Sequence, residues 1–174
     1  MRYIWEKARF AMILALISAL VCGTGPAVCA AVDTSTLDFN RTGSVSLTLM
    51  DADGNIMVDG AMTIYEVAVI SGEDDSLMYT YTEAFSGCGL TLMEDDGTLV
   101  LDANDGTLAA ALAVYVADNN ISGTSKKVGS DGTLCFDELE LGMYLVVQTT
   151  QSTEYSGISP FLVTVPYADA NGLI

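Results

Sequence analysis

The side chains that most often carry chemistry are scarce in this sequence. It has no histidine, which removes the commonest general base and most transition-metal sites. Of its four cysteines, only Cys88 and Cys135 follow residue 30. Two thiolates are too few for a thiolate zinc site. They leave two alternatives open, a disulfide between Cys88 and Cys135 or two buried thiols that act as small apolar side chains.

One cluster of acids imitates a metal-binding loop. Asp51, Asp53 and Asn55 have the spacing of the first half of a calcium loop. Ile56 stands where that loop requires glycine, and Met62 stands where it requires the final glutamate. We therefore interpret the segment as a turn in which the acids bond their own backbone.

Nucleophilic catalysis has little support in the sequence. Ser122 and Ser125 lie close to Lys126 and Lys127, the only lysines after residue 30, but no oxyanion-hole motif accompanies them. Solvated acids in turns are a better interpretation than a pair of carboxylates that hydrolyses sugars, because acids gather in turn-like runs such as 51–55, 95–97 and 102–106. We expect no catalytic residue, no cofactor and no metal, and hence a non-enzymatic function.

The charge of the chain excludes one class of partner. The formal net charge is −17, and Arg41, Lys126 and Lys127 are the only basic side chains after residue 30. So few cations cannot neutralise a phosphate backbone. Nucleic-acid binding is therefore excluded.

Residues 1–30 have the organisation of a signal peptide. Arg2, Lys7 and Arg9 precede an apolar run at 10–21, and Val-Cys-Ala at 28–30 is a small-residue cleavage signal. The apolar run is shorter than the roughly 20 residues that span a bilayer. We expect export, cleavage of residues 1–30 and no stable membrane insertion afterwards.

The remaining chain reads as a flexible lead-in at 31–41 followed by one β-rich domain at 42–174. Apolar residues alternate with polar ones over several short segments bounded by turn residues, which is typical of antiparallel strands with one buried face. The predicted strands lie at 43–51, 60–70 and 77–85, and around 134–136, 144–146 and 161–165. The segment 60–70 is apolar on both faces, which indicates a central strand covered on both sides.

One segment breaks the β pattern. Leu108, Ala111, Leu112, Tyr115 and Val116 recur at helical spacing. We predict a short helix over 105–119, capped by the aspartate at 105 and ended by the Asp-Asn-Asn run at 118–120. Its apolar stripe is expected to pack on the core.

The order of residues in the last third of the chain narrows the family. Asp-Gly-Thr-x-x-Phe at 131–136 precedes Leu-x-Leu-Gly-x-Tyr-Leu-Val-Val at 139–147 and Ser-Pro-Phe-Leu-Val-Thr-Val-Pro at 159–166. Together with the segments at 42–49 and 60–68, these motifs closely resemble the N-terminal domain of sortase-assembled pilin subunits of Gram-positive bacteria. The resemblance implies an all-β fold with one short inserted helix, an immunoglobulin-like β-sandwich of the Cna-B type.

The resemblance also directs attention to self-crosslinking. Related domains carry an isopeptide bond between a lysine on the first strand and an asparagine on the last, assisted by a buried acid. In this chain Leu49 and Met50 stand where a lysine is expected, and Gln148 aligns with the assisting glutamate. Glutamine cannot transfer the protons. We therefore predict that no isopeptide bond forms.

Related subunits continue beyond the segment that ends this chain. The resemblance implies a further strand beside the first one, a motif whose lysine attacks the sortase intermediate, more domains and a C-terminal sorting signal. None of these features stands in residues 1–174. We accordingly expect the domain at 42–174 to lack its last strand, and we carry over neither covalent polymerisation nor wall anchoring from the resemblance.

These observations predict a secreted, non-catalytic surface domain with a structural or adhesive role. Its expected partners are other pilin or surface-protein subunits and a host surface ligand, and its expected place is the cell surface, or the wall or pilus where the gene carries a sorting signal. The alternative is a free-standing secreted module that binds a ligand or glycan through loops at 71–76 and 150–157.

Overall fold

The computed structural model describes residues 38–51, 53–73, 76–92, 106–151, 157–166, 168–169 and 172–173. The predicted signal peptide at 1–30 and most of the predicted lead-in lie outside these residues. In the part of the chain that the structure describes, no helix has both the length and the apolar character needed to cross a membrane.

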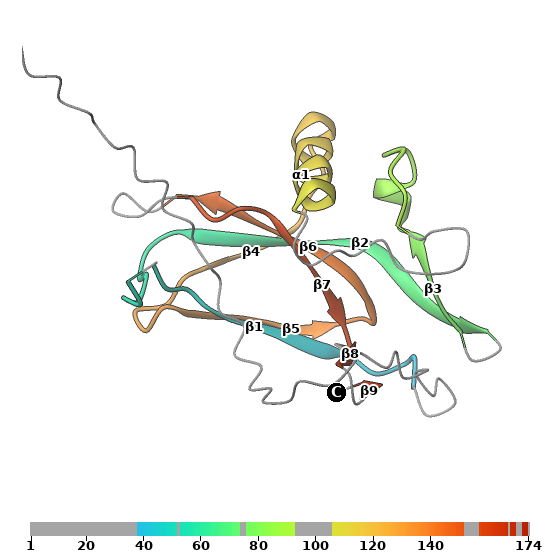
Figure 1. Cartoon of the computed structure of the whole chain (residues 1–174), viewed down its shortest axis with the longest axis horizontal. Coiled ribbons are helices and arrows are strands. Elements are labelled where there is room, and N and C mark those ends of the chain that lie inside the picture. Colours follow the sequence, from blue (N-terminus) through green and yellow to red (C-terminus); the bar gives the residue numbers. More distant parts are fainter. Residues whose placement is uncertain are drawn as a thin grey trace, which may run out of the picture.

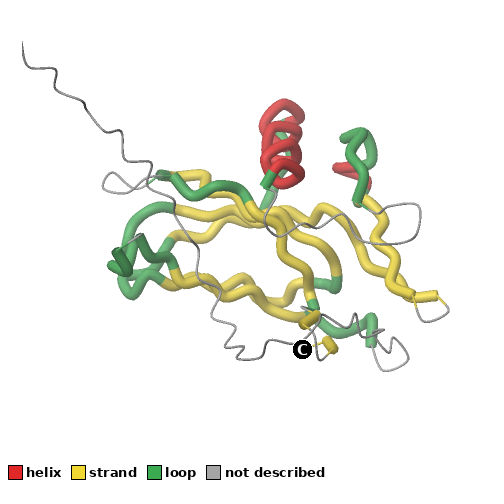
Figure 2. The backbone as a smooth tube through the Cα atoms, in the orientation of Figure 1, coloured by secondary structure: helices red, strands yellow, loops and turns green. Residues whose placement is uncertain are grey.

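Most of the described chain forms antiparallel strands in two facing sheets (Figures 1 and 2). The larger sheet has the order β3-β2-β6-β7, and β4 also pairs with β2; the smaller sheet contains β1 and β5. A short pair, β8 and β9, follows β7. The strands are β1 (Gly43–Thr48), β2 (Ala61–Glu73), β3 (Ser76–Tyr81), β4 (Thr124–Lys127), β5 (Thr133–Leu139), β6 (Gly142–Thr150), β7 (Phe161–Val165), β8 (Ala168–Asp169) and β9 (Gly172–Leu173).

The smaller sheet follows the alternation read from the sequence. Val45 pairs with Phe136 and Leu47 pairs with Leu134, so the apolar residues of β1 and β5 share the face toward the larger sheet. Between Gly43 and Val45 the register shifts, because β5 holds one extra residue there. Glu138, in this bulge, has a φ of 57°, a conformation that is uncommon for a residue with a side chain.

Strand β2 is the centre of the larger sheet. On one side it pairs with β6 from Ala61 to Val69. On the other side it pairs with β4 as far as Ile64, and with β3 from Ala68 onward. Figure 1 shows β4 and β3 along different parts of β2. The prediction that this strand is central and covered on both sides is confirmed. On the side of β4 and β3, no strand pairing is formed between Ile64 and Ala68 among the described residues.

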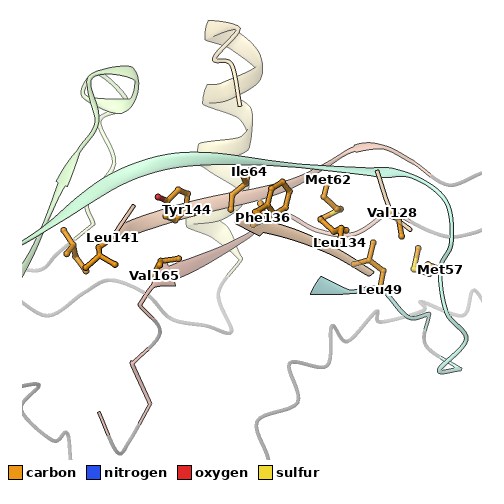
Figure 3. Packing of buried hydrophobic residues seen from close by; sticks show 12 residues of the cluster. Leu49, Met57, Met62, Ile64, Val128, Leu134, Phe136, Leu141, Tyr144 and Val165 are labelled. Atoms are coloured by element: carbon orange, nitrogen blue, oxygen red, sulfur yellow. The ribbon is translucent and has the colours of Figure 1, made fainter. Parts of the chain in front are cut away.

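The main core fills the space between the two sheets (Figure 3). Phe136 on β5 is 1% exposed and lies close to Ile64 and Met62 of β2 in this view. Burying such side chains is the dominant stabilising contribution, at about 25 cal/mol per Å² of apolar surface. The core consists of Leu49, Met57, Met62, Ile64, Ile70, Val128, Leu134, Phe136, Leu141, Tyr144, Val146 and Val165.

A second cluster covers the opposite face of the larger sheet. Helix α1 (Thr107–Asn119) buries Leu112 and Val116 there, against residues of β2 and β6 and against Phe85. Because both faces of β2 and β6 are covered, these strands are apolar throughout rather than alternating. The predicted packing of the helix on the core is confirmed.

The C-terminal end of the helix agrees with the prediction, and the N-terminal end does not. Asn120 ends α1 in the left-handed conformation, as asparagine often does after the last helical turn. At the start, Gly106 occupies the capping position and offers no side-chain hydrogen bond, so the predicted cap by an aspartate was wrong. Asp105 itself lies outside the described residues.

Three short elements differ from the sequence-based expectation. The predicted strand at 77–85 ends at Tyr81, and Glu83–Phe85 forms one 3₁₀ turn, labelled η2, that buries Phe85. Strand β4 and the β8–β9 pair were not predicted. The turn η2, the strand β4 and the β8–β9 pair are polar or only a few residues long. Their hydrophobic pattern is therefore too weak to predict a helix or a strand.

The glycine of the Leu-Gly-x-Tyr motif has a steric role. A Cβ built on Gly142 would lie 2.5 Å from the carbonyl oxygen of Ala68. Real Cβ atoms do not approach backbone oxygen so closely, so any larger residue would push β6 away from β2. The motif therefore reflects the close pairing of the two central strands at the start of β6.

Candidate functional site

The resemblance predicts that Leu49, Met50 and Gln148 replace the residues of a crosslink, and all three take part in structural contacts. Leu49 is buried in the main core; its N–H donates to Gly132 O at 2.9 Å, and its carbonyl accepts from Met57 N at 2.9 Å. Met50 is 41% exposed and forms an isolated bridge with Ile56. Neither side chain carries the amine that an isopeptide bond needs.

Gln148 anchors a loop. It lies on β6 opposite Met62, and its Oε1 accepts a hydrogen bond of 2.7 Å from the backbone N–H of Ile158. This bond ties the start of β7 to the end of β6, on either side of the segment 152–156, which lies outside the described residues. A neutral amide suits this task because it accepts a hydrogen bond without a buried charge.

We expect the intact mass of the purified chain to equal the mass of its sequence, allowing for cleavage after the signal peptide. Leu49, Met50 and Gln148 offer neither the amine nor the acid that an isopeptide bond needs. A mass lower by one ammonia or one water, together with a branched peptide at a lysine after digestion, would contradict this expectation.

The two cysteines are free thiols in the structure. Cys88 follows η2 and packs against the cluster under α1, on the outer face of the larger sheet. Cys135 lies on β5 of the smaller sheet. Both are partly buried, and the choice between a disulfide and two thiols stays a prediction.

Cys135 belongs to a polar group that sequence reasoning missed. Its Sγ donates to Asp137 Oδ1 at 2.9 Å and accepts from Ser46 Oγ at 3.2 Å. Lys126 reaches across from β4, donates to the carbonyl of Cys135 and lies 3.4 Å from Asp137 Oδ2. The hydrogen bonds from Cys135 and then Lys126 lower the pKa of Asp137. Both ions are exposed, so we interpret the group as a surface brace between β4 and β5.

Titration of denatured, unreduced protein with a thiol reagent should therefore find both Cys88 and Cys135 reactive. Cys88 packs with the cluster under α1, whereas Cys135 lies on β5 and bonds to Asp137, so each thiol has its own neighbours. Alanine at either position serves as the control, because it should remove one reactive group. Reactivity of neither thiol before reduction, and of both afterwards, would contradict the separation seen in the structure.

The calcium-like segment is a turn. Asp51 Oδ1 accepts from the backbone N–H groups of Asp53 at 2.9 Å and Asn55 at 2.8 Å, and its Oδ2 accepts from Asn55 Nδ2 at 2.9 Å. These bonds, with Asn55 as the main partner, lower the pKa of Asp51. Among the described residues, no group of three acids or cysteines could hold a metal ion.

The interruption in the larger sheet forms a groove that no sequence pattern indicates. Two adjoining hollows of about 500 Å³ and about 470 Å³ share Tyr65, Glu66 and Ser122. Thr82 closes part of the interruption, because its N–H donates to Val67 O and its Oγ1 donates to Glu66 O. We call this feature the Glu66 groove. Its other lining residues are Ile64, Thr82, Glu83, Ala84, Phe85, Ile121, Gly123, Thr124, Glu138, Leu139, Glu140 and Tyr144.

Glu66 is the electrostatically unusual residue of the groove. Its Oε1 is buried and has no hydrogen-bond partner among the described residues. Burial, and to a lesser extent the charge of Glu140, raise the pKa of Glu66. The hydroxyl of the neighbouring Tyr144 donates to the carbonyl of Glu140 at 2.7 Å rather than to Glu66.

One of the two segments expected to bind a ligand belongs mostly to the strands. Residues Ser71 and Gly72 continue β2, and Glu73 pairs with Ser76 of β3, so the segment 71–76 is mostly a strand hairpin. Most of 150–157 lies outside the described residues. The Glu66 groove is therefore the candidate binding site of the described chain.

Comparison with known proteins finds similarity in structure but not in sequence. No family model matches the chain, and no curated protein matches it. The T6 backbone pilin of serotype M6 Streptococcus pyogenes, described as a modular three-domain structure decorated with variable loops and extensions, matches 79% of this chain with a TM-score of 0.50 and 20% identity. The full-length major pilin SpaD of Corynebacterium diphtheriae matches 78% with a TM-score of 0.42 and 21% identity.

This chain spans about a quarter of each pilin, 25% of the first and 27% of the second. The likeness to the T6 pilin extends over most of the described strands and confirms the predicted β-sandwich with one short helix. The chain therefore has the fold of a domain of Gram-positive pilins.

Proposed function

We propose that this protein is an exported, non-catalytic surface domain of the pilin type, spanning residues 42–174, with a structural or adhesive role. The observation that carries the proposal is the match of its two-sheet arrangement to the T6 backbone pilin over 79% of the chain. The signal-peptide pattern at 1–30 supports export, and the partners we propose are other pilin or surface-protein subunits.

The domain that we propose has no internal isopeptide bond, because Leu49 and Gln148 stand where the resemblance predicts the crosslinking residues. Leu49 and Gln148 serve packing and loop anchoring, so the fold depends on its core and hydrogen bonds rather than on an internal covalent bond. Such a domain holds its shape while folded but offers no covalent protection against mechanical extension. We therefore place it where it contributes a rigid unit or a contact surface.

Cell fractionation of the source bacterium with an antibody to the folded domain tests this proposal. The protein should be found in the cell-wall fraction or the medium, and immunogold labelling should place it on the outer surface. Antibody to a known cytoplasmic enzyme provides the control for lysis. Retention of the protein in the cytoplasm of intact cells would refute the proposed function.

The alternative of a free-standing ligand-binding module makes a different prediction. A wall or pilus subunit should co-purify with other surface proteins after gentle wall digestion. A free-standing module should instead accumulate in the medium as a single species. Recovery of only the free species would favour the module over the subunit.

A further inference from the structure

One edge of the smaller sheet carries no strand in the part of the chain that the structure describes. β5 pairs with one side of β1, and no described strand pairs with the other. The N–H of Leu49 donates to Gly132 O at 2.9 Å, so the backbone groups of Leu49 face the side of β5. Successive residues of an antiparallel strand direct their backbone groups to alternate sides. The backbone groups of Ser44, Ser46 and Thr48 therefore point to the open edge.

The open edge of β1 lacks the features that normally prevent a strand from pairing with another molecule. Natural edge strands are protected by charged side chains, prolines or bulges. The sequence of β1, Gly-Ser-Val-Ser-Leu-Thr, contains neither a charge nor a proline, and the bulge of this sheet lies on β5. The half-buried side chains of Val45 and Leu47 add apolar surface at the rim of the main core. An added strand would find both backbone partners and apolar contacts.

The edges of the larger sheet are better protected. β7 is bounded by Pro160 and Pro166, which cannot donate a hydrogen bond to a neighbouring strand. β3 follows an acidic run at 73–75, and β4 contains Lys126 and Lys127. The open edge of β1 is therefore the most suitable of these edges for pairing.

The charges at the two ends of β1 fit a second copy of the same chain. When two β1 strands pair antiparallel about a two-fold axis, each contact occurs twice, with the roles of the two copies exchanged. An axis at Ser46 places Ser44 opposite Thr48 of the second copy, and it places Arg41 opposite Asp51 of the second copy. The pairing thus joins opposite charges at both ends of an otherwise neutral edge.

We propose that two copies of this chain associate through their β1 edges and form one continuous antiparallel sheet in the order β5-β1-β1-β5. The pairing uses the open backbone groups of Ser44, Ser46 and Thr48 in both copies. It also extends a sheet that has two strands among the described residues, which alone are marginal in water. The net charge of −17 on each copy opposes close approach, so the association is weak and reversible. It does not depend on where the protein is located.

Sedimentation equilibrium of the exported chain, at up to about 1 mM protein and in about 0.15 M salt, measures this association. We expect monomers and dimers in reversible equilibrium. Ser46→Pro removes the N–H at the centre of the open edge and keeps the bonds to β5, so it should abolish the dimer. Ser130→Pro is the matched control, because Ser130 lies in the turn closed by the bond from Gly132 N to Gly129 O, where proline is tolerated.

Arg41→Gln tests the ends of the pairing. Each dimer would lose two contacts between Arg41 and Asp51, so the dissociation constant should rise about fivefold, as two exposed ion pairs imply. Lys127→Gln is the matched control, because it removes the same charge from an exposed position on β4. It should change the dissociation constant by less than about twofold, since a distant charge is screened.

Single cysteines test the register. In a chain that carries Cys88→Ala and Cys135→Ala, Ser46→Cys should form a disulfide-linked dimer on mild oxidation. The Cα atoms of a hydrogen-bonded pair lie about 5.5 Å apart, a distance that a disulfide spans. Thr48→Cys should not crosslink, because the two copies of position 48 lie about 13 Å apart along the strands. Cys135 is replaced because its Sγ lies 3.2 Å from Ser46 Oγ and would react with the new thiol.

The proposal is wrong if the chain stays monomeric at the highest concentration, or if Ser46→Pro dimerises as Ser130→Pro does. Equal crosslinking by Thr48→Cys and Ser46→Cys would also overturn it. Species that grow beyond the dimer with concentration would contradict it too, because a two-fold contact closes on itself. Circular dichroism verifies that Ser46→Pro folds; if it does not fold, Arg41→Gln and the cysteine variants decide the question. None of these results bears on the cellular location of the protein.

Discussion

Replacing Phe136 by alanine is expected to lower the free energy of unfolding by about 3–5 kcal/mol, the range for a large aromatic side chain lost from a core. Phe136 is 1% exposed and lies between the sheets, close to Ile64 in Figure 3. Among the described residues the smaller sheet has two strands, and two strands alone are marginal in water. It therefore depends on side chains such as Phe136 for its attachment to the larger sheet.

Urea denaturation followed by circular dichroism measures this effect. Val114→Ala is the control, because Val114 is 60% exposed on α1 and its truncation should change stability by no more than about 0.5 kcal/mol. The expected loss for Phe136→Ala is a large share of the roughly 5–15 kcal/mol that stabilise a typical domain. A loss below about 1 kcal/mol for Phe136→Ala would show that the sheets do not pack through this ring.

The sequence was most informative where a strand has strong and regular burial. The alternation in β1 and β5 and the continuous apolar run in β2 arise directly from the faces that each strand buries, so periodicity could identify them. The glycine before Tyr144 likewise records the close approach of β6 to Ala68. Constraints of this local kind can therefore be predicted from the order of residues.

The candidate site could not be predicted in the same way. The Glu66 groove exists because β4 and β3 pair with different parts of β2, and no local pattern near Glu66 reports how far two other strands extend. β4 itself has the sequence Thr-Ser-Lys-Lys, which carries no apolar alternation. Similarly, Lys126 meets Asp137 and Cys135 only because β4 and β5 become neighbours in the folded chain.

The second prediction concerns pH. The pKa of Glu66 is raised in the folded chain above its ordinary value of 4.5, first by burial and then by Glu140. The folded state therefore binds the proton more tightly than the unfolded state does. The stabilising contribution of protonated Glu66 is complete below pH 4.5, and it is lost as the pH rises through the raised pKa of the folded state.

Glu66→Gln removes this dependence. The variant should melt at a higher temperature than the wild type at neutral pH, and the difference between them should shrink as the pH falls toward 4.5. Other acids of this highly charged chain also make stability vary with pH, so the informative quantity is the difference between variant and wild type at each pH.

Two further variants separate the causes of this effect. Glu140→Gln removes the second contribution to the raised pKa of Glu66, so it should stabilise the domain at neutral pH in the same direction but by less. Asp118→Asn removes an equal charge from an exposed site at the end of α1 and is the matched control. Scanning calorimetry at several pH values between 4 and 8 provides the comparison. If Glu66→Gln and Asp118→Asn behaved alike, the carboxyl of Glu66 would be solvated like any surface acid, and burial in the groove would not govern its ionisation.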